Sequence, residues 1–503
     1  MVDARRQVTP HALKGCEHPS PDHVCLSGPV GLPGRGRRAA RQGVRRAPRQ
    51  GLAASGASDE SSFRASPRAG APSRRAVRDR RQRHPGERPE IHMAVRRVYS
   101  GTARSIAACC ASGVLAALLA ATPSAAAGHG GGVPAGPRGE GFYHAPRGLV
   151  EHGRHGTLIR AQRLTGVAAF AGADNWRVLY RSVTPQGRTV AVSGTVAIPH
   201  GRPPAGGWPV LSWLHGTTGV ADACAPSRDT ADGPAHDYLQ AMQDTVAPWV
   251  SRGYAVTRTD YQGLGTDGAH SYLVGEAEAR AAADLTRAAH QLSRQLSDEW
   301  VAYGHSQGGH AAVFAADLAN RWTPELRLLG AAALAPGSQL SAAVPTLREQ
   351  PFSGVSDFFP LIVRGAQTVR SMPDEDIFTP QALAVAGDAD RMCSAQLRAP
   401  DSWGSLKSDE IFREGADLTA LDKVLADNEP GLLSPRVPVL LAQGGKDTVI
   451  QPAWTAALDG QLRANGVYVT SYTYPEADHR GVLSASLPDV TRWIDRLFGR
   501  PRG

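Results

Sequence analysis

The sequence lacks several features that mark common functional classes. It has no glycine-rich phosphate loop, no dinucleotide-binding fingerprint, and no His/Cys cluster at the spacing of metal ligands, so we expect neither a metal nor a cofactor. Beyond residue 127 it also has no apolar run of about 20 residues, the length needed to span a membrane. These absences argue against a nucleotide-dependent enzyme, a metalloenzyme and an integral membrane protein.

An excess of basic charge is also missing from most of the chain. Lys and Arg outnumber Asp and Glu by 55 to 46 over 503 residues, which taken alone would favour a nucleic-acid binder. However, residues 1–92 hold 19 basic and 8 acidic side chains, and residues 93–127 add three Arg. The remaining 33 basic and 38 acidic side chains make residues 128–503 mildly acidic. We therefore expect no nucleic-acid partner.

The first 127 residues have the composition of an arm followed by a secretion signal. Residues 1–92 are rich in Arg, Pro, Gly and Ser without apolar periodicity, so they cannot offset the entropy cost of folding. Residues 93–127 combine a basic start, an apolar run and small residues ending at Ala127, which predicts a signal peptide cleaved near Ala127 and a secreted protein. Because a signal peptide belongs at the start of a chain, we expect translation to begin at Met93. Residues 1–92 are then a start-site artefact, and a genuine basic arm is the alternative.

Only two cysteines remain after the expected cleavage. Four of the six lie in the arm and the signal segment, which leaves Cys224 and Cys393. Two thiols in an exported protein are a natural disulfide pair. Because the sequence does not show whether the two residues meet, the bond is a hypothesis at this point.

Strand-like and helix-like segments alternate from about residue 142 onward, after an expected flexible lead-in over residues 128–141. This alternation predicts an α/β fold with a mostly parallel central sheet and helices on both faces. The alternation stops over residues 339–430, which contain several Pro and acidic helical pieces, and then resumes. We interpret residues 339–430 as an inserted cap or lid, and residues 142–338 and 431–503 as the core.

The strongest motif is GHSQG at residues 304–308, between a predicted strand and a predicted helix. It matches the Gly-x-Ser-x-Gly nucleophile elbow, in which glycines two positions either side of the serine let strand and helix approach each other. Such a turn presents the serine hydroxyl at the end of the strand. The sequence therefore predicts Ser306 as a catalytic nucleophile.

A serine nucleophile needs a base and an orienting acid, and candidates for both follow it in the chain. Asp447 comes just after the predicted strand VPVLLA, and His479 just past the last predicted strand, in the Ser–Asp–His order of this fold. The other histidine after Ser306, His310, lies on the helix leaving the elbow, and we expect it to point away. Asp260 precedes Ser306, so we expect it to hold loops at the edge of the site. The predicted triad is Ser306, Asp447 and His479.

A His-Gly loop, LHGTTG at residues 214–219, follows another predicted strand. A loop at this place commonly supplies one oxyanion donor, and the residue after the nucleophile supplies the other. We therefore predict the backbone N–H groups of Thr217 and Gln307 as the oxyanion hole. For the side chains of His215 and His305 we expect local packing.

Several segments together make the stretch from Phe142 to about Phe498 resemble the secretory lipase family of the α/β-hydrolase fold. They are GTLIRAQRL, RVLYRS, VAVSGTVAIP, HGTTG, DYQGLGT, GHSQGG, QGGKDTVI and EADH. The resemblance implies lipase or carboxylesterase activity with Ser306, Asp447 and His479 as the triad. It also implies a cap inserted before the acid-bearing strand, and a lipid or ester substrate that meets the enzyme in water or at a lipid–water interface.

We therefore predict a secreted serine hydrolase that cleaves carboxylic esters of lipids through an acyl-enzyme on Ser306, without a cofactor. A short-chain or aromatic-ester esterase, an acyltransferase, an amidase or peptidase, and a non-catalytic binding module on the same scaffold remain alternatives, because the triad does not choose among them. The apolar piece VSDFFPLIV of the expected cap either lines an acyl pocket or fills the cap core.

Overall fold

The computed structural model describes residues 132–349 and 355–500. The expected basic arm and signal peptide, and four of the six cysteines, lie outside the described residues. All of the elements below belong to one compact unit of the chain.

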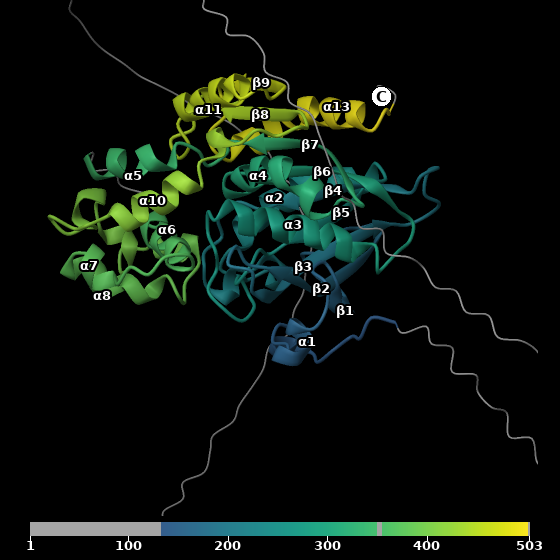
Figure 1. The fold of residues 1–503 in the computed structure, drawn as a ribbon, viewed down its shortest axis with the longest axis horizontal. Helices are drawn as coiled ribbons and strands as arrows, with labels where there is room; N and C mark the ends of the chain where they lie inside the picture. Colours follow the sequence, from purple (N-terminus) through teal and green to yellow (C-terminus); the bar gives the residue numbers. More distant parts are fainter. Residues whose placement is uncertain (1–131, 350–354, 501–503) are drawn as a thin grey trace, which may run out of the picture. The chain divides into compact units, whose positions relative to one another are not determined.

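Nine strands form a single sheet in the part of the chain that the structure describes (Figure 1). In chain order they are β1 (Leu158–Arg163), β2 (Ala173–Val183), β3 (Thr189–Pro199), β4 (Trp208–Leu214), β5 (Ala255–Thr259), β6 (Leu296–His305), β7 (Arg327–Leu334), β8 (Val439–Gly444) and β9 (Val469–Tyr474). Their spatial order is β1-β2-β3-β5-β4-β6-β7-β8-β9. The first three and β5 pair antiparallel, and all pairs from β5 to β9 are parallel. The mostly parallel sheet expected from the sequence is confirmed.

The parallel strands are apolar because both faces of the sheet are covered. Every residue of β4 and of β8 is buried, as is typical of strands in a sheet between two helix layers. Parallel strands also point their carboxyl ends to the same edge of the sheet. The loops that follow β4, β6, β8 and β9 therefore meet at one edge.

Helices cover both faces of the sheet. The apolar cluster on one face includes side chains of α3 (Gly275–Ala289), α4 (Gln307–Trp322) and α11 (Pro452–Ala464). The cluster on the other face includes side chains of α2 (His236–Ser251), α12 (Gly481–Ala485) and α13 (Leu487–Leu497). This two-sided arrangement is the one predicted.

The N-terminal part of the described chain lies along the antiparallel edge of the sheet. Short helices η1 (Gly139–Phe142) and α1 (Arg147–Glu151) precede β1. The N–H group of Ala161 on β1 donates to the Pro134 carbonyl (2.9 Å), and Gln162 Nε2 donates to the Ala135 carbonyl (2.8 Å). The described part of the expected flexible lead-in is thus held against β1 by hydrogen bonds.

A largely helical segment stands between β7 and β8, and we call residues 340–432 the inserted segment. Its helices are α5 (Leu340–Glu349), α6 (Phe358–Gln367), α7 (Asp374–Ile377), α8 (Pro380–Val385), α9 (Ser394–Leu397) and α10 (Thr419–Asp427). Four short 3-10 helices belong to it as well: η4 (Ala386–Asp388), η5 (Trp403–Ser405), η6 (Ser408–Glu410) and η7 (Pro430–Leu432). Figure 1 shows these helices gathered in one group. Together with Val220, Tyr272 and Leu273 of the core, they form an apolar cluster, which includes Phe359, Phe378, Trp403 and Ile411.

Candidate active site

The nucleophile elbow predicted from GHSQG is present between β6 and α4. Ser306 has φ 58° and ψ −118°, a left-handed backbone that few non-glycine residues adopt. A Cβ on Gly304 would lie 2.1 Å from the Gly308 carbonyl oxygen, and a Cβ on Gly308 would lie 1.9 Å from the Leu214 carbonyl oxygen. Only glycine therefore fits at these two positions, and the close approach holds Ser306 at the sheet edge.

The three side chains of the predicted triad meet in space. His479 Nδ1 lies 2.8 Å from Asp447 Oδ2, and His479 Nε2 lies 3.1 Å from Ser306 Oγ. An ionised carboxylate only accepts hydrogen bonds, so Nδ1 carries the proton and Nε2 accepts the Ser306 hydroxyl. This is the tautomer that a histidine needs in order to act as a base toward serine.

The Asp447 carboxylate is fixed by three further hydrogen bonds. Its Oδ1 accepts the N–H groups of Val449 (2.8 Å) and Ile450 (2.9 Å), and its Oδ2 accepts Gln443 Nε2 (3.1 Å). The residue is 4% exposed. Because every one of these partners donates, the loop after β8 holds the carboxylate in one orientation toward His479.

The two predicted oxyanion residues come from two different parts of the chain. Thr217 lies in the loop after β4 and borders the same cavity as Ser306. Gln307 is the first residue of α4, where backbone N–H groups have no partner within the helix. The Gln307 side chain is bound elsewhere, since its Nε2 donates to Glu278 Oε1 (2.8 Å). Gln307 therefore offers the site its backbone N–H group.

His305 packs behind the site, as expected, and also contacts it. Its Nε2 lies 2.7 Å from the His479 carbonyl oxygen, which can only accept, and its Nδ1 lies 2.6 Å from the Tyr238 hydroxyl. Burial lowers the pKa of His305 well below its ordinary value. A neutral ring that donates from Nε2 and accepts at Nδ1 satisfies both contacts. His305 thus anchors the backbone of His479.

The other candidate residues lie away from the nucleophile. His310 is fully buried between Glu278 Oε2 and the Asn428 carbonyl, at 2.9 Å from each, which agrees with its expected orientation. Asp260 accepts hydrogen bonds from the hydroxyls of Ser193 and Ser227, so it links β3 to η3 (Pro226–Arg228). Burial raises the pKa of Asp260.

His215 is also structural. It is 3% exposed, its Nδ1 lies 2.8 Å from the Gly216 carbonyl, and burial lowers its pKa to about 4. The loop that starts at His215 is held close to the nucleophile elbow at Gly216. A Cβ on Gly216 would lie 3.0 Å from the His305 carbonyl oxygen and closer still to the Tyr238 hydroxyl.

A cavity of about 440 Å³ opens beside Ser306 and His479. Four residues of the inserted segment contribute to its wall: Phe358, Ser394, Ala395 and Arg398. The piece VSDFFPLIV divides between the two roles considered for it, because Phe358 borders the cavity whereas Phe359, Leu361 and Val363 are buried in the cluster of the inserted segment.

Polar side chains that no sequence motif marks also border the cavity. Tyr238 comes from α2, Arg398 follows α9, and Arg480 directly follows His479. The Arg480 guanidinium lies 5.0 Å from the centre of the Tyr238 ring. The position of Arg480 beside His479 was readable from the sequence, whereas the other two lie far along the chain from any motif.

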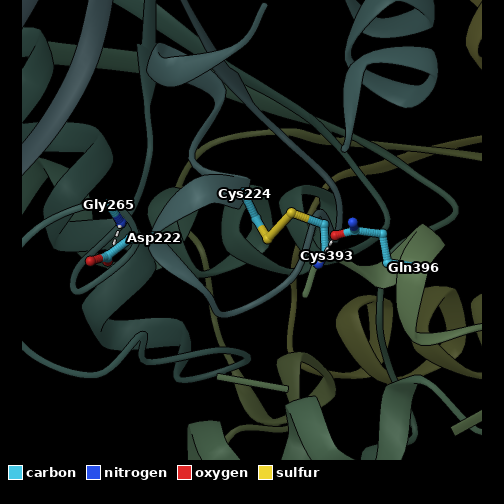
Figure 2. Close-up of a disulfide and its surroundings, with 5 residues drawn as sticks. All are labelled: Asp222, Cys224, Gly265, Cys393 and Gln396. Atoms are coloured by element: carbon cyan, nitrogen blue, oxygen red, sulfur yellow. Dashed lines mark hydrogen bonds between the residues drawn. A yellow bond between two sulfur atoms is a disulfide. The ribbon is translucent and has the colours of Figure 1, made fainter. Parts of the chain in front are cut away.

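A disulfide joins the inserted segment to the loop region after β4, as Figure 2 shows. Cys224, in η2 (Asp222–Cys224), is bonded to Cys393, and their Cα atoms are 5.5 Å apart. The next residue strengthens the link, because the Ser394 N–H group donates to the Thr218 carbonyl (2.9 Å). The hypothesis of a Cys224–Cys393 bond is confirmed.

No helix within residues 132–349 and 355–500 has the length and apolar character needed to cross a bilayer. Within the same ranges, no group of three or more His, Cys, Asp or Glu side chains is arranged to hold a metal ion.

A mostly parallel sheet between two helix layers, with a Ser–His–Asp line at its carboxyl edge, defines the α/β-hydrolase class. The chain belongs to the secretory lipase family, whose profile matches residues 237–503. Family membership confirms the predicted class of lipid-ester hydrolase and supports secretion of the protein.

Individual relatives and solved structures are distant. Secreted triacylglycerol lipase LIP4 of Malassezia globosa is 25% identical over 72% of this chain and 82% of its own length. A protein of Mycobacterium tuberculosis named a probable inactive lipase is 24% identical over 73% and 83%. Candida antarctica lipase A in its closed state has a TM-score of 0.60 at 20% identity, covering 72% of this chain and 86% of that one. The rice cell wall degrading esterase LipA of Xanthomonas oryzae has a TM-score of 0.57 at 19% identity, covering 70% and 100%.

Proposed function

We propose that this protein is an active secreted ester hydrolase in which Ser306 is the nucleophile, His479 the general base and Asp447 the orienting acid. The observation that carries the proposal is the hydrogen-bonded line from Ser306 through His479 to Asp447 beside an open cavity. As Ser306 Oγ attacks the ester carbonyl, its proton passes to His479 Nε2. The Asp447 carboxylate stabilises the imidazolium that forms.

The backbone N–H groups of Thr217 and Gln307 hold the oxygen of the tetrahedral intermediate. Removal of one such donor costs about 10²- to 10³-fold in kcat in a well-studied serine hydrolase. The alcohol then leaves with the proton from His479, and an acyl group remains on Ser306. Water attacks this acyl-enzyme with His479 again as base, and the carboxylic acid is released.

The completeness of the triad matters because one relative is named a probable inactive lipase. In this chain the base meets both of its partners within 3.1 Å, and the acid is held by three further donors. This geometry supports an active enzyme over a non-catalytic binding module.

Two parts of the proposal concern the rest of the chain. Residues 339–430 act as a cap whose wall residues limit the substrate, in agreement with the four side chains that the inserted segment contributes to the cavity. Residues 93–127 act as a signal peptide cleaved near Ala127. Similarity to proteins named secreted lipases supports this role.

The charged side chains on the cavity wall favour short-chain esters as a second candidate substrate class. Charged side chains border the cavity, among them Asp232, Asp237, Arg398, Asp478 and Arg480. Its larger apolar groups are those of Pro234, Tyr238, Phe358 and Val449. An acyl chain gains about 0.8 kcal/mol per CH₂ only where it leaves water for an apolar surface. A long acyl chain gains little of this beside charged groups.

The deciding experiment is hydrolysis of nitrophenyl esters with acyl chains of two to about sixteen carbons, compared with Ser306→Ala. Ser471→Ala is the matched control, because Ser471 is an exposed β9 residue whose hydroxyl is also hydrogen-bonded, in this case to Asp459. We expect Ser306→Ala to lose activity and the control to keep it. A maximum at short chains would assign an esterase, and one at long chains a lipase. An added alcohol that diverted the acyl group would assign a transferase, and equal activity in Ser306→Ala would refute the nucleophile.

A further inference from the structure

A buried tyrosine holds the side chain of the predicted oxyanion residue. Tyr272 OH lies 2.8 Å from Thr217 Oγ1. Tyr272 is 5% exposed, whereas Thr217 is half-buried and borders the cavity that contains Ser306. The two hydroxyls thus form a pair with one end inside the protein and the other end at the reaction site.

The direction of this hydrogen bond follows from the surroundings of the two groups. Burial raises the pKa of Tyr272, so the phenol is protonated at neutral pH. Among the described residues, the Thr217 hydroxyl is the hydrogen-bond partner of that phenol. If Thr217 donated instead, the tyrosine proton would be buried without an acceptor, which is costly. Tyr272 therefore donates, which leaves the Thr217 hydroxyl proton available to an acceptor in the cavity that Thr217 borders.

The backbone on both sides of Thr217 is fixed by contacts, one of them with the residue before the nucleophile. On one side Gly216 packs against the backbone of His305, the residue before Ser306. On the other side the Thr218 carbonyl accepts the Ser394 N–H group (2.9 Å), next to the Cys224–Cys393 disulfide drawn in Figure 2. The loop is thus anchored on both sides.

From these contacts we propose that the Thr217 hydroxyl is a third hydrogen-bond donor to the oxyanion, and that Tyr272 is the positioning residue that keeps it donating. The inference rests on the proposed function of Ser306. Thr217 supplies two donors, its backbone N–H and its Oγ–H, and Gln307 supplies the third. A donor oriented before the reaction stabilises the transition state without reorganisation, so its loss acts on kcat and leaves KM nearly unchanged.

The test compares Thr217→Val, which keeps the shape but removes the hydroxyl, with Thr217→Ser, which keeps the hydroxyl. We expect kcat to fall by about 10²-fold in Thr217→Val, with KM within about twofold, and to remain within about fivefold of the parent in Thr217→Ser. Affinity for an alkyl boronic acid, which forms a tetrahedral adduct on serine, should fall with kcat/KM. Thr245→Val, a buried threonine of α2 bonded to the Ala241 carbonyl, controls for general effects of the exchange on folding.

Tyr272→Phe provides a second and independent variant. It should lower kcat about tenfold in the parent and have no further effect in Thr217→Val, because Tyr272 acts only through the Thr217 hydroxyl. A Thr217→Val kcat within threefold of the parent, a loss confined to KM, or additive losses in the double variant would overturn the proposal. Ser306→Ala in the same assay separates a failure of the third-donor proposal from a failure of the proposed function. Activity that depends on Ser306 but not on the Thr217 hydroxyl refutes the third donor alone, whereas activity that persists in Ser306→Ala refutes the proposed function.

Discussion

The Cys224–Cys393 bond closes a long loop, so its removal should destabilise the protein measurably. The two residues are 169 positions apart. The loop-entropy model gives an entropy loss of about 17 cal/mol/K for a loop of this length, or about 5 kcal/mol at 25 °C. Because measured effects of native disulfides usually fall in a range of about 2–5 kcal/mol, we expect the free energy of unfolding to decrease by an amount within that range in the Cys224→Ala/Cys393→Ala variant.

Urea unfolding followed by circular dichroism measures this difference. Both sulfurs are fully buried, so substitution is a cleaner perturbation than a reductant, which reaches the bond poorly in the folded protein. Cys224→Ala alone already breaks the bond and should lose nearly as much as the double variant. The reasoning is refuted if the double variant unfolds at the same urea concentration and with the same slope as the parent, or if the second substitution costs as much as the first.

Three further predictions follow from buried polar groups and close contacts. The pKa of His215 is about 4 in the fold and 6.5 ordinarily, so its contribution to stability is full above pH 6.5 and is lost as the pH falls toward 4. In His215→Gln, the slope of unfolding free energy against pH should decrease by about 1.4 kcal/mol per unit in that window, and an unchanged slope contradicts this. Gly304→Ala places a Cβ 2.1 Å from a backbone oxygen and should abolish folding or activity. Gly460→Ala in α11, whose Cβ would have no atom within 4 Å, should instead stabilise the protein by about 0.5–1 kcal/mol. Equal melting temperatures of the two variants would count against this reasoning. His305→Phe removes the hydrogen bond to the His479 carbonyl and should lower kcat about tenfold with little change in KM, and steady-state kinetics that show only a KM effect would exclude this role.

Local features of the sequence were sufficient for the class of fold and for the elbow. The two glycines of GHSQG flank a serine with positive φ, and that requirement is a property of a few adjacent residues. The fully buried strands β4 and β8 are apolar runs, which a sequence displays directly. The order of Ser306, Asp447 and His479 along the chain then predicted which side chains would meet, because parallel strands deliver their following loops to one edge.

Contacts between distant segments were decided only by the tertiary structure. The sequence left the pairing of Cys224 with Cys393 open, and it left the piece VSDFFPLIV between pocket and core. The structure divides that piece, with Phe358 at the cavity and Phe359 in the interior. No motif marked Tyr238, which reaches the site from α2.

The same distinction separates the two parts of the proposed oxyanion site. The sequence by itself identified the loop of Thr217, because a His-Gly loop after a buried strand is a local pattern. The hydrogen bond between Tyr272 and the Thr217 hydroxyl joins residues 55 positions apart. A single tyrosine forms no sequence pattern from which its partner could be predicted. Which groups meet across such distances depends on how helices and loops pack around the sheet, and that packing exists only in the folded chain.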